Sequence, residues 1–165
     1  MMDDEILEAA TRVLALCRSR GWRVATAESC TGGLIAGAMT EIAGSSDVVE
    51  GGFVTYSNAA KTALVGVPSE LFEQVGAVSA EVARAMAEGT LVRLPAAELA
   101  VSATGIAGPG GATPGKPVGL VHFGLARRAG PVTAHAQVFP GNRAEVRRAA
   151  VRYALSLLET AASNA

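Results

Sequence analysis

Apolar residues recur at helical spacing in the first segment of the chain. The stretch from Asp3 to Arg20 carries a single apolar face, formed by Ile6, Ala10, Val13, Leu14 and Cys17. Acidic residues open this stretch, arginines close it and Gly21 follows, which is the usual order of charges and stop signals along a helix. The pattern predicts an amphipathic helix with Cys17 in the core.

Shorter patterns alternate between strand and helix over the rest of the chain. Apolar runs predict strands at 22–27, 49–56, 99–104, 118–126 and 132–139, the last two joined by a hairpin near 128–130. Capped helical patterns predict helices at 34–42, from Asn58 over Lys61, from Pro68 to Gly76, from Ser79 to Leu94, and from Asn142 to Glu159. Glu145 stands three residues after Asn142, as in a capping box.

This order of elements indicates a fold class. Strands that alternate with helices are typical of an α/β protein with a largely parallel sheet covered on both faces. The closing hairpin must add at least one antiparallel strand. No repeat or low-complexity linker interrupts the pattern, so residues 1–165 are predicted to form one domain.

Composition narrows the classes of function. With 14 basic and 15 acidic residues the formal net charge is −1, so we expect no charged face for nucleic acid or an anionic membrane. No apolar run approaches the roughly 20 residues of a membrane span. The acidic start, Met-Met-Asp-Asp-Glu, is unlike a secretory signal, so a cytoplasmic location is expected. Two cysteines and two histidines, scattered along the chain, show no zinc-binding spacing, so no metal is expected.

Candidate chemistry begins where the first predicted strand ends, at Ala-Glu-Ser-Cys-Thr-Gly-Gly (27–33). In open α/β sheets ligands bind beyond the carboxyl ends of the strands, where the amides and dipole of the next helix favour negative charge. A Ser29 hydroxyl at this turn could attack a carbonyl, with backbone amides nearby for the oxyanion. The expected substrate contacts beside it are Cys30, Thr31, Gly32 and Gly33.

Other interpretations of the same turn stay open. Ser29 or Thr31 could only cap the following helix, and Glu28 is interpreted as an ordinary surface or structural acid. Cys30 is a rival nucleophile, because a helix start lowers the pKa of a thiol. A cysteine hydrolase generally needs a neighbouring histidine, however, and neither histidine stands at a strand-to-helix turn.

A second segment, Gly-Phe-Val-Thr-Tyr-Ser-Asn-Ala-Ala-Lys (52–61), ends the second predicted strand and enters the next short helix. If this strand neighbours the first, Tyr56 and Lys61 can both reach the Ser29 turn. A neutral amine can take the proton of a serine, and burial disfavours the ammonium form. Lys61 is therefore a candidate base and Tyr56 a candidate relay, against the alternative of a surface lysine and an interfacial tyrosine.

A third segment, Thr-Gly-Ile-Ala-Gly-Pro-Gly-Gly (104–111), follows the third strand and should face the same rim. Its glycine-rich backbone can offer amides to a phosphate or a carbonyl oxygen, which makes candidate contacts of Thr104, Gly105, Ile106, Ala107 and Gly108. On the last helix Arg143 and Arg147 are one turn apart and could grip a phosphate, although such a run is more often a solvated face. The spacing from Gly110 to Lys116 matches a P-loop, but Pro117 and the strand after it argue against a nucleoside triphosphatase.

Together these three segments resemble the CinA carboxy-terminal domain family. Gly76-Ala77-Val78-Ser79 and Lys116-Pro117-Val118-Gly119 are similar to that family too, so the resemblance covers nearly the whole chain. It implies a three-layer α/β/α sandwich with a mixed, mostly parallel five-stranded sheet, and a homo-oligomer. It also implies hydrolysis of nicotinamide mononucleotide to nicotinic acid mononucleotide and ammonia, without metal or cofactor. Ser29 would then be the nucleophile, Lys61 the base and Tyr56 an assisting group.

Two further hypotheses remain beside the amidohydrolase. A non-catalytic nucleotide-binding or competence- and damage-linked interaction module would need only the glycine-rich loops, and a cysteine hydrolase would use Cys30. In many relatives of the family this domain follows a larger amino-terminal domain. The sequence here resembles the carboxy-terminal domain alone, so we expect the stand-alone form of the enzyme.

Overall fold

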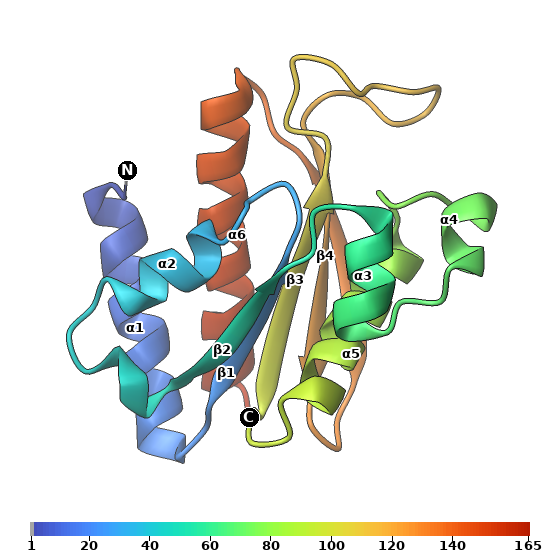
Figure 1. The fold of residues 1–165 in the computed structure, drawn as a ribbon. Helices are drawn as coiled ribbons and strands as arrows, with labels where there is room; N and C mark the ends of the chain where they lie inside the picture. The colour runs from blue at the N-terminus through green and yellow to red at the C-terminus, as the bar shows by residue number, and fades with distance from the viewer. Residues whose placement is uncertain (1) are drawn as a thin grey trace.

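A computed structural model describes residues 2–165 of the chain. These residues form α1 (Asp4–Arg20), β1 (Val24–Glu28), α2 (Leu34–Thr40), the short 3₁₀ helix η1 (Ser45–Asp47), β2 (Val49–Val54), α3 (Asn58–Val65), α4 (Glu70–Gln74), α5 (Ala80–Arg93), β3 (Leu99–Gly105), β4 (Leu120–Arg127), β5 (Val132–Val138) and α6 (Arg143–Ser163). Figure 1 shows the order in space, which confirms the predicted α/β fold.

The strands form one mixed sheet in the order β2-β1-β3-β4-β5. β1 pairs in parallel with β2 and β3, whereas β4 pairs antiparallel with β3 and β5. The predicted hairpin thus supplies the antiparallel pairs, and β1 lies beside β2, as the expected meeting of Ser29 with Lys61 requires. Every residue of β1 is buried, including the polar Thr26 and Glu28, which agrees with a sheet covered on both faces.

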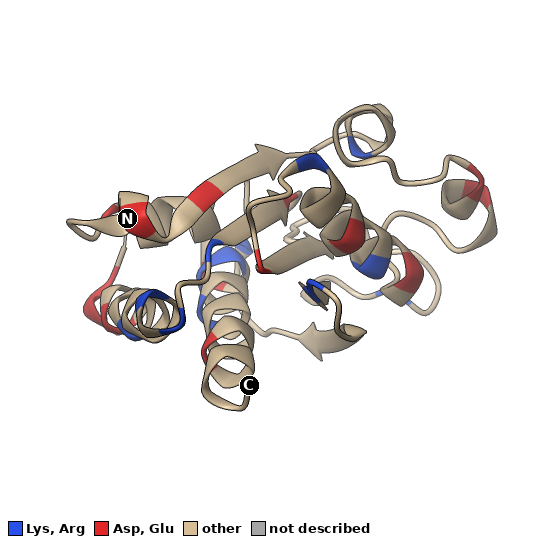
Figure 2. Ribbon diagram, turned by 90° about the horizontal axis from the view of Figure 1, so that it is seen from below, with Lys and Arg blue, Asp and Glu red and all other residues tan. Residues whose placement is uncertain are grey.

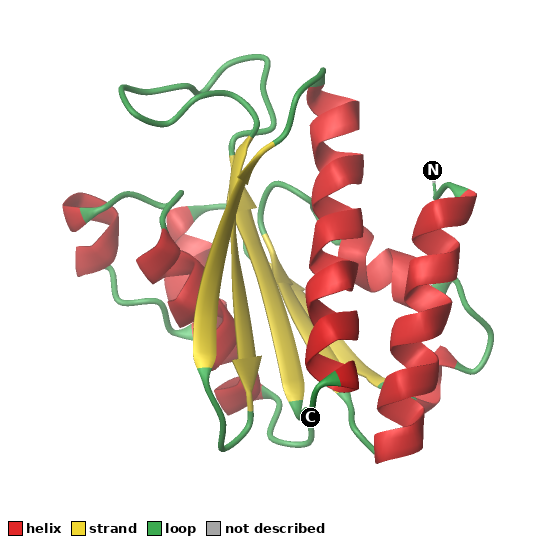
Figure 3. Cartoon of the chain, turned by 180° about the vertical axis from the view of Figure 1, so that it is seen from behind, coloured by secondary structure: helices red, strands yellow, loops and turns green. Residues whose placement is uncertain are grey.

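Helices cover both faces of the sheet, which completes the predicted α/β/α sandwich (Figure 3). α1, α2 and α6 pack together on one face, and α5 packs on the other with α3 and α4 beside it. On the α6 side Phe123 contacts the rings of Phe139 and Tyr153, with ring centroids 6.2 Å and 4.8 Å away. Full burial of one such side chain stabilises the fold by about 1.5–3 kcal/mol.

The predicted N-caps of α5 and α6 are confirmed, whereas the N-cap of α3 is a different residue from the one predicted. Asn142 and Glu145 form the capping box of α6, and Ser79 Oγ accepts a hydrogen bond from the amide of the first turn of α5. α3 is capped by Ser57, whose Oγ accepts from the Ala60 amide at 3.0 Å, and not by Asn58. The correction moves the start of α3 by one residue and leaves Lys61 on its inner face.

Several element boundaries also differ by a few residues from those predicted, among them the starts of α4 and β4. α4 begins at Glu70 and not at Pro68, because the carbonyl of Pro68 accepts from the Leu71 amide in a tighter turn. β4 begins at Leu120 and not at residue 118, because Gly119 has a φ of 94° that only glycine adopts readily. Both differences lie in connections, where sequence patterns define ends less sharply than middles.

Charged residues are interspersed along the helices and loops (Figure 2). Several form exposed ion pairs, such as Arg12 with Glu159 at 2.9 Å and Arg23 with Glu50 at 3.2 Å. Pairs of this kind contribute only about 0–1 kcal/mol each. Within residues 2–165, none of the helices has both the length and the apolar character needed to cross a membrane.

Candidate functional site

The carboxyl ends of β1, β2 and β3 meet at one edge of the sheet, and the three segments singled out in the sequence begin there (Figure 1). Ser29 directly follows β1, Lys61 lies on the helix after β2, and Thr104 is near the end of β3. Between them is a pocket of about 220 Å³, lined by Ser29, Cys30, Tyr56, Asn58, Lys61, Ala77, Val78, Thr104, Gly105, Ala107 and Arg143. The topology therefore brings a hydroxyl, an amine and a glycine-rich loop to one cavity.

Lys61 and Ser29 are in direct contact at the bottom of this pocket. Lys61 Nζ lies 3.1 Å from Ser29 Oγ, and it also lies 2.9 Å from the Thr55 carbonyl oxygen and 3.3 Å from that of Tyr56. The exposed fractions of the two side chains are only 2% for Lys61 and 9% for Ser29. Ser29 Oγ has the Tyr56 carbonyl as a second, longer contact at 3.4 Å. The pair is therefore held by backbone oxygens and shielded from bulk water.

The surroundings of Lys61 favour its neutral form. Burial lowers the pKa of the Lys61 ammonium, and the nearby Cys30 acts weakly in the opposite direction. Among the described residues no carboxylate lies within ion-pair distance of Lys61. In the structure Lys61 Nζ donates to Ser29 Oγ; in its neutral form the amine would keep two N–H donors for the two carbonyls and have one lone pair to accept the proton of Ser29. The geometry thus fits an amine that can accept the proton of Ser29.

Glu28 has a structural role that sequence reasoning did not predict, which is to cap the amino-terminal end of α2. Its carboxylate accepts hydrogen bonds from the amides of Ile35 at 2.8 Å and Ala36 at 3.0 Å, in the first turn of α2. The N-cap residue of α2 is Gly33, which has no side chain to do this. Glu28 therefore takes the place of the missing cap and neutralises the positive end of the helix. These two amides are not available to an oxyanion, contrary to the general expectation for a helix that follows a strand.

Of the turn residues 29–33, only Ser29 and Cys30 line the pocket. Cys30 lines the pocket, but burial raises the pKa of its thiol to about 11. A thiol in that state is a poor nucleophile, because the thiolate is the reactive form. Thr31 is fully buried behind the pocket, and Gly32 and Gly33 adopt positive φ angles of 60° and 98° that shape the turn.

The glycine-rich loop after β3 contributes part of what the sequence suggested. Thr104, Gly105 and Ala107 line the pocket, whereas Ile106 and Gly108 do not. The Thr104 hydroxyl donates to the Ala77 carbonyl at 2.9 Å, so it is used inside the protein. The Ile106 amide and carbonyl are bound to the residues that open β4, which fixes the course of the loop.

Arg143, on the first turn of α6, bridges two sides of the pocket. Its guanidinium donates to the Gly108 carbonyl at 2.9 Å and to the Tyr56 hydroxyl at 3.1 Å. Tyr56 is 62% exposed, and it is the backbone carbonyl of this residue, not the phenol, that contacts Ser29 and Lys61. Arg147 is not in the pocket; it donates to the carbonyls of the Ser29 turn, at Cys30 with a distance of 3.1 Å. The two arginines therefore have different roles despite their spacing.

Comparison with known proteins agrees with this arrangement. The sequence model of the CinA C-terminal domain matches residues 6–162. The chain belongs to this family. It is 48% identical over 155 residues to nicotinamide-nucleotide amidohydrolase PncC of Enterobacter agglomerans, covering 94% of each protein. It is 50% identical over 161 residues to a CinA-like protein of Mycolicibacterium vanbaalenii, of which it spans only 36%. The crystal structure of the competence/damage inducible protein CihA from Agrobacterium tumefaciens superposes with a TM-score of 0.94, at 49% identity and with 99% and 98% of the two chains covered.

The structure also places residues in this pocket that sequence reasoning did not select. Asn58, Ala77 and Val78 line it, the last two from the connection between α4 and α5. The tetrapeptide Gly76-Ala77-Val78-Ser79, which is similar to the family, was the signal that could have identified Ala77 and Val78, whereas Asn58 lies within the segment 52–61 that carries Lys61.

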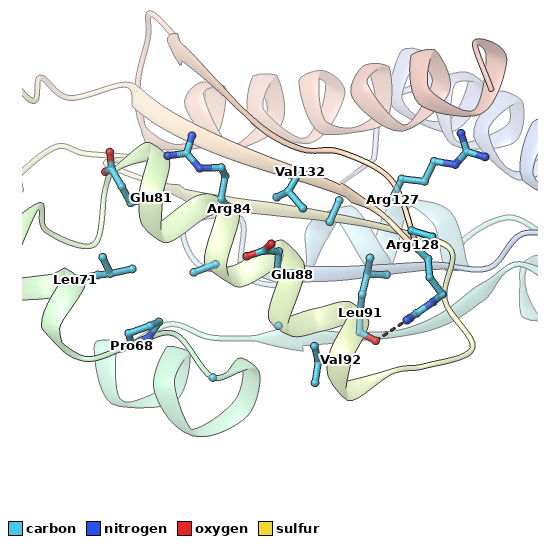
Figure 4. Close-up of a pocket in the computed structure, with 15 residues that line it drawn as sticks. Pro68, Leu71, Glu81, Arg84, Glu88, Leu91, Val92, Arg127, Arg128 and Val132 are labelled. Atoms are coloured by element: carbon cyan, nitrogen blue, oxygen red, sulfur yellow. Dashed lines mark hydrogen bonds between the residues drawn. The ribbon is translucent and has the colours of Figure 1, made fainter.

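A larger groove of about 810 Å³ runs along α5, between α4 and the β4–β5 hairpin (Figure 4). Glu81, Arg84 and Glu88 lie on its α5 side, and Arg128 donates to the Leu91 carbonyl at its far end. The residues that line it include no serine, cysteine, histidine or lysine. The smaller pocket is therefore the one with the groups for nucleophilic chemistry.

Proposed function

We propose that this chain is an amidohydrolase that converts nicotinamide mononucleotide and water to nicotinic acid mononucleotide and ammonia. The observation that carries the proposal is the buried contact between Lys61 Nζ and Ser29 Oγ at 3.1 Å, with no carboxylate paired to the lysine among the described residues. The full-length similarity to relatives named nicotinamide-nucleotide amidohydrolase supports the choice of substrate. The reaction is an acyl transfer to water through a serine ester.

The first step forms the acyl-enzyme. Neutral Lys61 takes the Ser29 proton while Ser29 Oγ attacks the carboxamide carbon, which gives a tetrahedral intermediate with a negative oxygen. The amide of Cys30, the residue after the nucleophile, is the proposed donor to that oxygen, as in other strand-turn-helix nucleophile turns. Protonated Lys61 then gives its proton to the amide nitrogen, the C–N bond breaks and ammonia leaves.

The second step is hydrolysis of the ester by the same groups. Lys61, neutral again, takes a proton from a water molecule, whose oxygen attacks the acyl carbon. The C–O bond to Ser29 breaks, Ser29 recovers a proton from Lys61, and the carboxylic acid product leaves and gives its remaining proton to the solvent or to the released ammonia. Neither step consumes any group of the protein, so each cycle starts from the same state.

Arg143 is the proposed partner of the substrate phosphate. It lies at the pocket mouth on the exposed first turn of α6, where both its charge and the helix dipole favour an anion. The guanidinium has five N–H donors and uses two of its nitrogens for Gly108 and Tyr56, so donors remain for a phosphate. Arg147 donates to the carbonyls of Cys30 and Thr31. We therefore assign it to holding the turn that carries the nucleophile, and not to binding substrate.

Ammonia release from nicotinamide mononucleotide by the pure protein, with a chelator present, tests the function. Ser29→Ala is expected to lower kcat by about 10⁴-fold or more, and the exposed Ser46→Ala serves as the matched control with wild-type activity. Full activity of Ser29→Ala refutes the nucleophile. Calorimetric binding of several pyridine nucleotides without turnover by the wild type identifies a non-catalytic binding module instead. The homo-oligomer stays a prediction, which light scattering after size-exclusion chromatography checks.

A further inference from the structure

The connection between α4 and α5 forms one wall of the pocket. We call residues 75–78 the wall segment, because Ala77 and Val78 project small apolar side chains into the cavity beside Ser29. The segment belongs to neither helix, and it contains Gly76, whose φ of 78° is the left-handed conformation that glycine adopts readily. A connection of this kind needs other parts of the protein to fix its position.

Three side chains bind three consecutive carbonyls of the wall segment. Lys116 Nζ donates to the Val75 carbonyl at 2.6 Å. Ser79 Oγ donates to the Gly76 carbonyl at 2.8 Å, and Thr104 Oγ1 donates to the Ala77 carbonyl at 2.9 Å. The donors come from the loop before β4, the start of α5 and the end of β3, so the wall segment is held from three directions.

Of the three hydrogen bonds to the wall segment, the one from Lys116 joins the residues that are farthest apart in the sequence. It is 41 residues from Val75 in the sequence, and its own backbone is fixed by reciprocal hydrogen bonds with Thr113 at 2.9 Å and 3.0 Å. A Cβ on Gly76 would lie 2.9 Å from Nζ, so the glycine leaves space for the ammonium. The chain has only two lysines beside twelve arginines; Lys61 donates to the Thr55 carbonyl beside the pocket, and Lys116 donates to the Val75 carbonyl in the wall segment. A compact ammonium suits the space better than a planar guanidinium does.

We propose that Lys116 is a positioning residue which, by holding the wall segment, sets the fit of the pocket to the substrate's aromatic ring. This inference rests on the proposed function, because the ring is that of a pyridine carboxamide whose amide carbon sits at Ser29. A flat ring then packs between the small side chains of Ala77, Val78 and Ala107, which all line the cavity. Loss of the Lys116 contact lets the wall move, which weakens ring binding while Ser29 and Lys61 stay in contact.

The test compares Lys116→Met, which keeps the aliphatic stem, with Lys116→Arg, which keeps a donor. In Lys116→Met we expect KM for nicotinamide mononucleotide to rise about tenfold, with kcat changed by less than about twofold. Lys116→Arg is expected to recover part of the loss. Thr113→Ala, in the same loop but with a side chain that makes no hydrogen bond among the described residues, is the matched control.

Amide hydrogen exchange followed by mass spectrometry measures the local stability of the wall segment without any substrate. Peptides that cover residues 75–79 should exchange at least about threefold faster in Lys116→Met than in the wild type, because one anchoring hydrogen bond is lost. Unchanged exchange overturns the inference, as does faster exchange with unchanged KM, or a loss of kcat at constant KM. If the wild type releases no ammonia, the proposed function fails, and the exchange comparison alone decides whether Lys116 holds the wall segment.

Discussion

The buried amine of Lys61 makes folding stability and activity depend on pH through one group. Burial lowers its pKa from the ordinary value of 10.5 in the folded state, whereas the unfolded chain keeps that ordinary value. Between the two pKa values the unfolded chain binds one proton more than the folded chain, so the free energy of unfolding rises with pH. Below the lowered pKa both states are charged, and the dependence disappears.

Replacing Lys61 by Met isolates this effect. The methionine has a similar shape and does not titrate, so the difference in free energy of unfolding between wild type and variant contains the contribution of Lys61. At pH values between the folded-state and the unfolded-state pKa of Lys61, this amine is charged only in the unfolded chain. In that range the free energy of unfolding of the wild type should rise, relative to that of Lys61→Met, by about 1.4 kcal/mol per pH unit. This slope follows from the difference of one bound proton, and the burial of the side chain, which is 2% exposed, determines only how wide the pH window is.

Urea unfolding of both proteins at a series of pH values up to the ordinary lysine pKa of 10.5 measures the slope. The pH profile of kcat/KM of the wild type provides a second reading, because activity should fall as the pH drops through the same folded-state pKa. Agreement between the midpoint of the activity profile and the start of the stability slope identifies Lys61 as the base. A difference in unfolding free energy that stays constant over this range, together with a flat kcat/KM profile, refutes the reasoning.

Three further substitutions have definite expected outcomes. Glu28→Ala should lower the free energy of unfolding by about 2–5 kcal/mol in urea titrations, because it leaves two amides of α2 buried without acceptors; a loss below about 0.5 kcal/mol contradicts the capping role. Tyr56→Phe should lower kcat/KM by less than about tenfold, since the phenol contacts Arg143 and not Ser29; a loss as large as that of Ser29→Ala would make the phenol part of the chemistry. Cys30→Ser should keep kcat within about threefold in the ammonia assay, because the thiol of Cys30 is protonated at neutral pH; complete inactivation of a folded variant would return Cys30 to consideration as the nucleophile.

The sequence predicted the meeting of Ser29 and Lys61 on the condition that their two strands are neighbours, and the strand order of the sheet meets that condition. Parallel strands bring their carboxyl ends to one edge, so residues that follow β1, β2 and β3 converge whatever their loops do in detail. The apolar runs were long enough to identify these strands, and the capping signals at Ser79 and Asn142 were local to their helices.

Contacts that depend on the exact path of a loop were not predictable. Glu28 reaches an amide seven residues ahead, which needs the two positive φ angles at Gly32 and Gly33. Whether the phenol or the carbonyl of Tyr56 faces the lysine is decided by one peptide orientation in the turn before α3. The anchoring of the wall segment by Lys116 joins positions 41 residues apart, for which periodicity carries no information.

No carboxylate among the described residues is paired with Lys61, so we expect the charge of a bound substrate to influence the ionisation of this lysine. Nicotinamide in its mononucleotide is a pyridinium, and a fixed positive ring that displaces water from the cavity disfavours a second positive charge beside it. Substrate entry should therefore expel the remaining proton from the amine into the solvent. Calorimetric titration in buffers of different ionisation enthalpy would record that proton as a heat proportional to the buffer's own, so the substrate itself generates the unprotonated lysine that its hydrolysis requires.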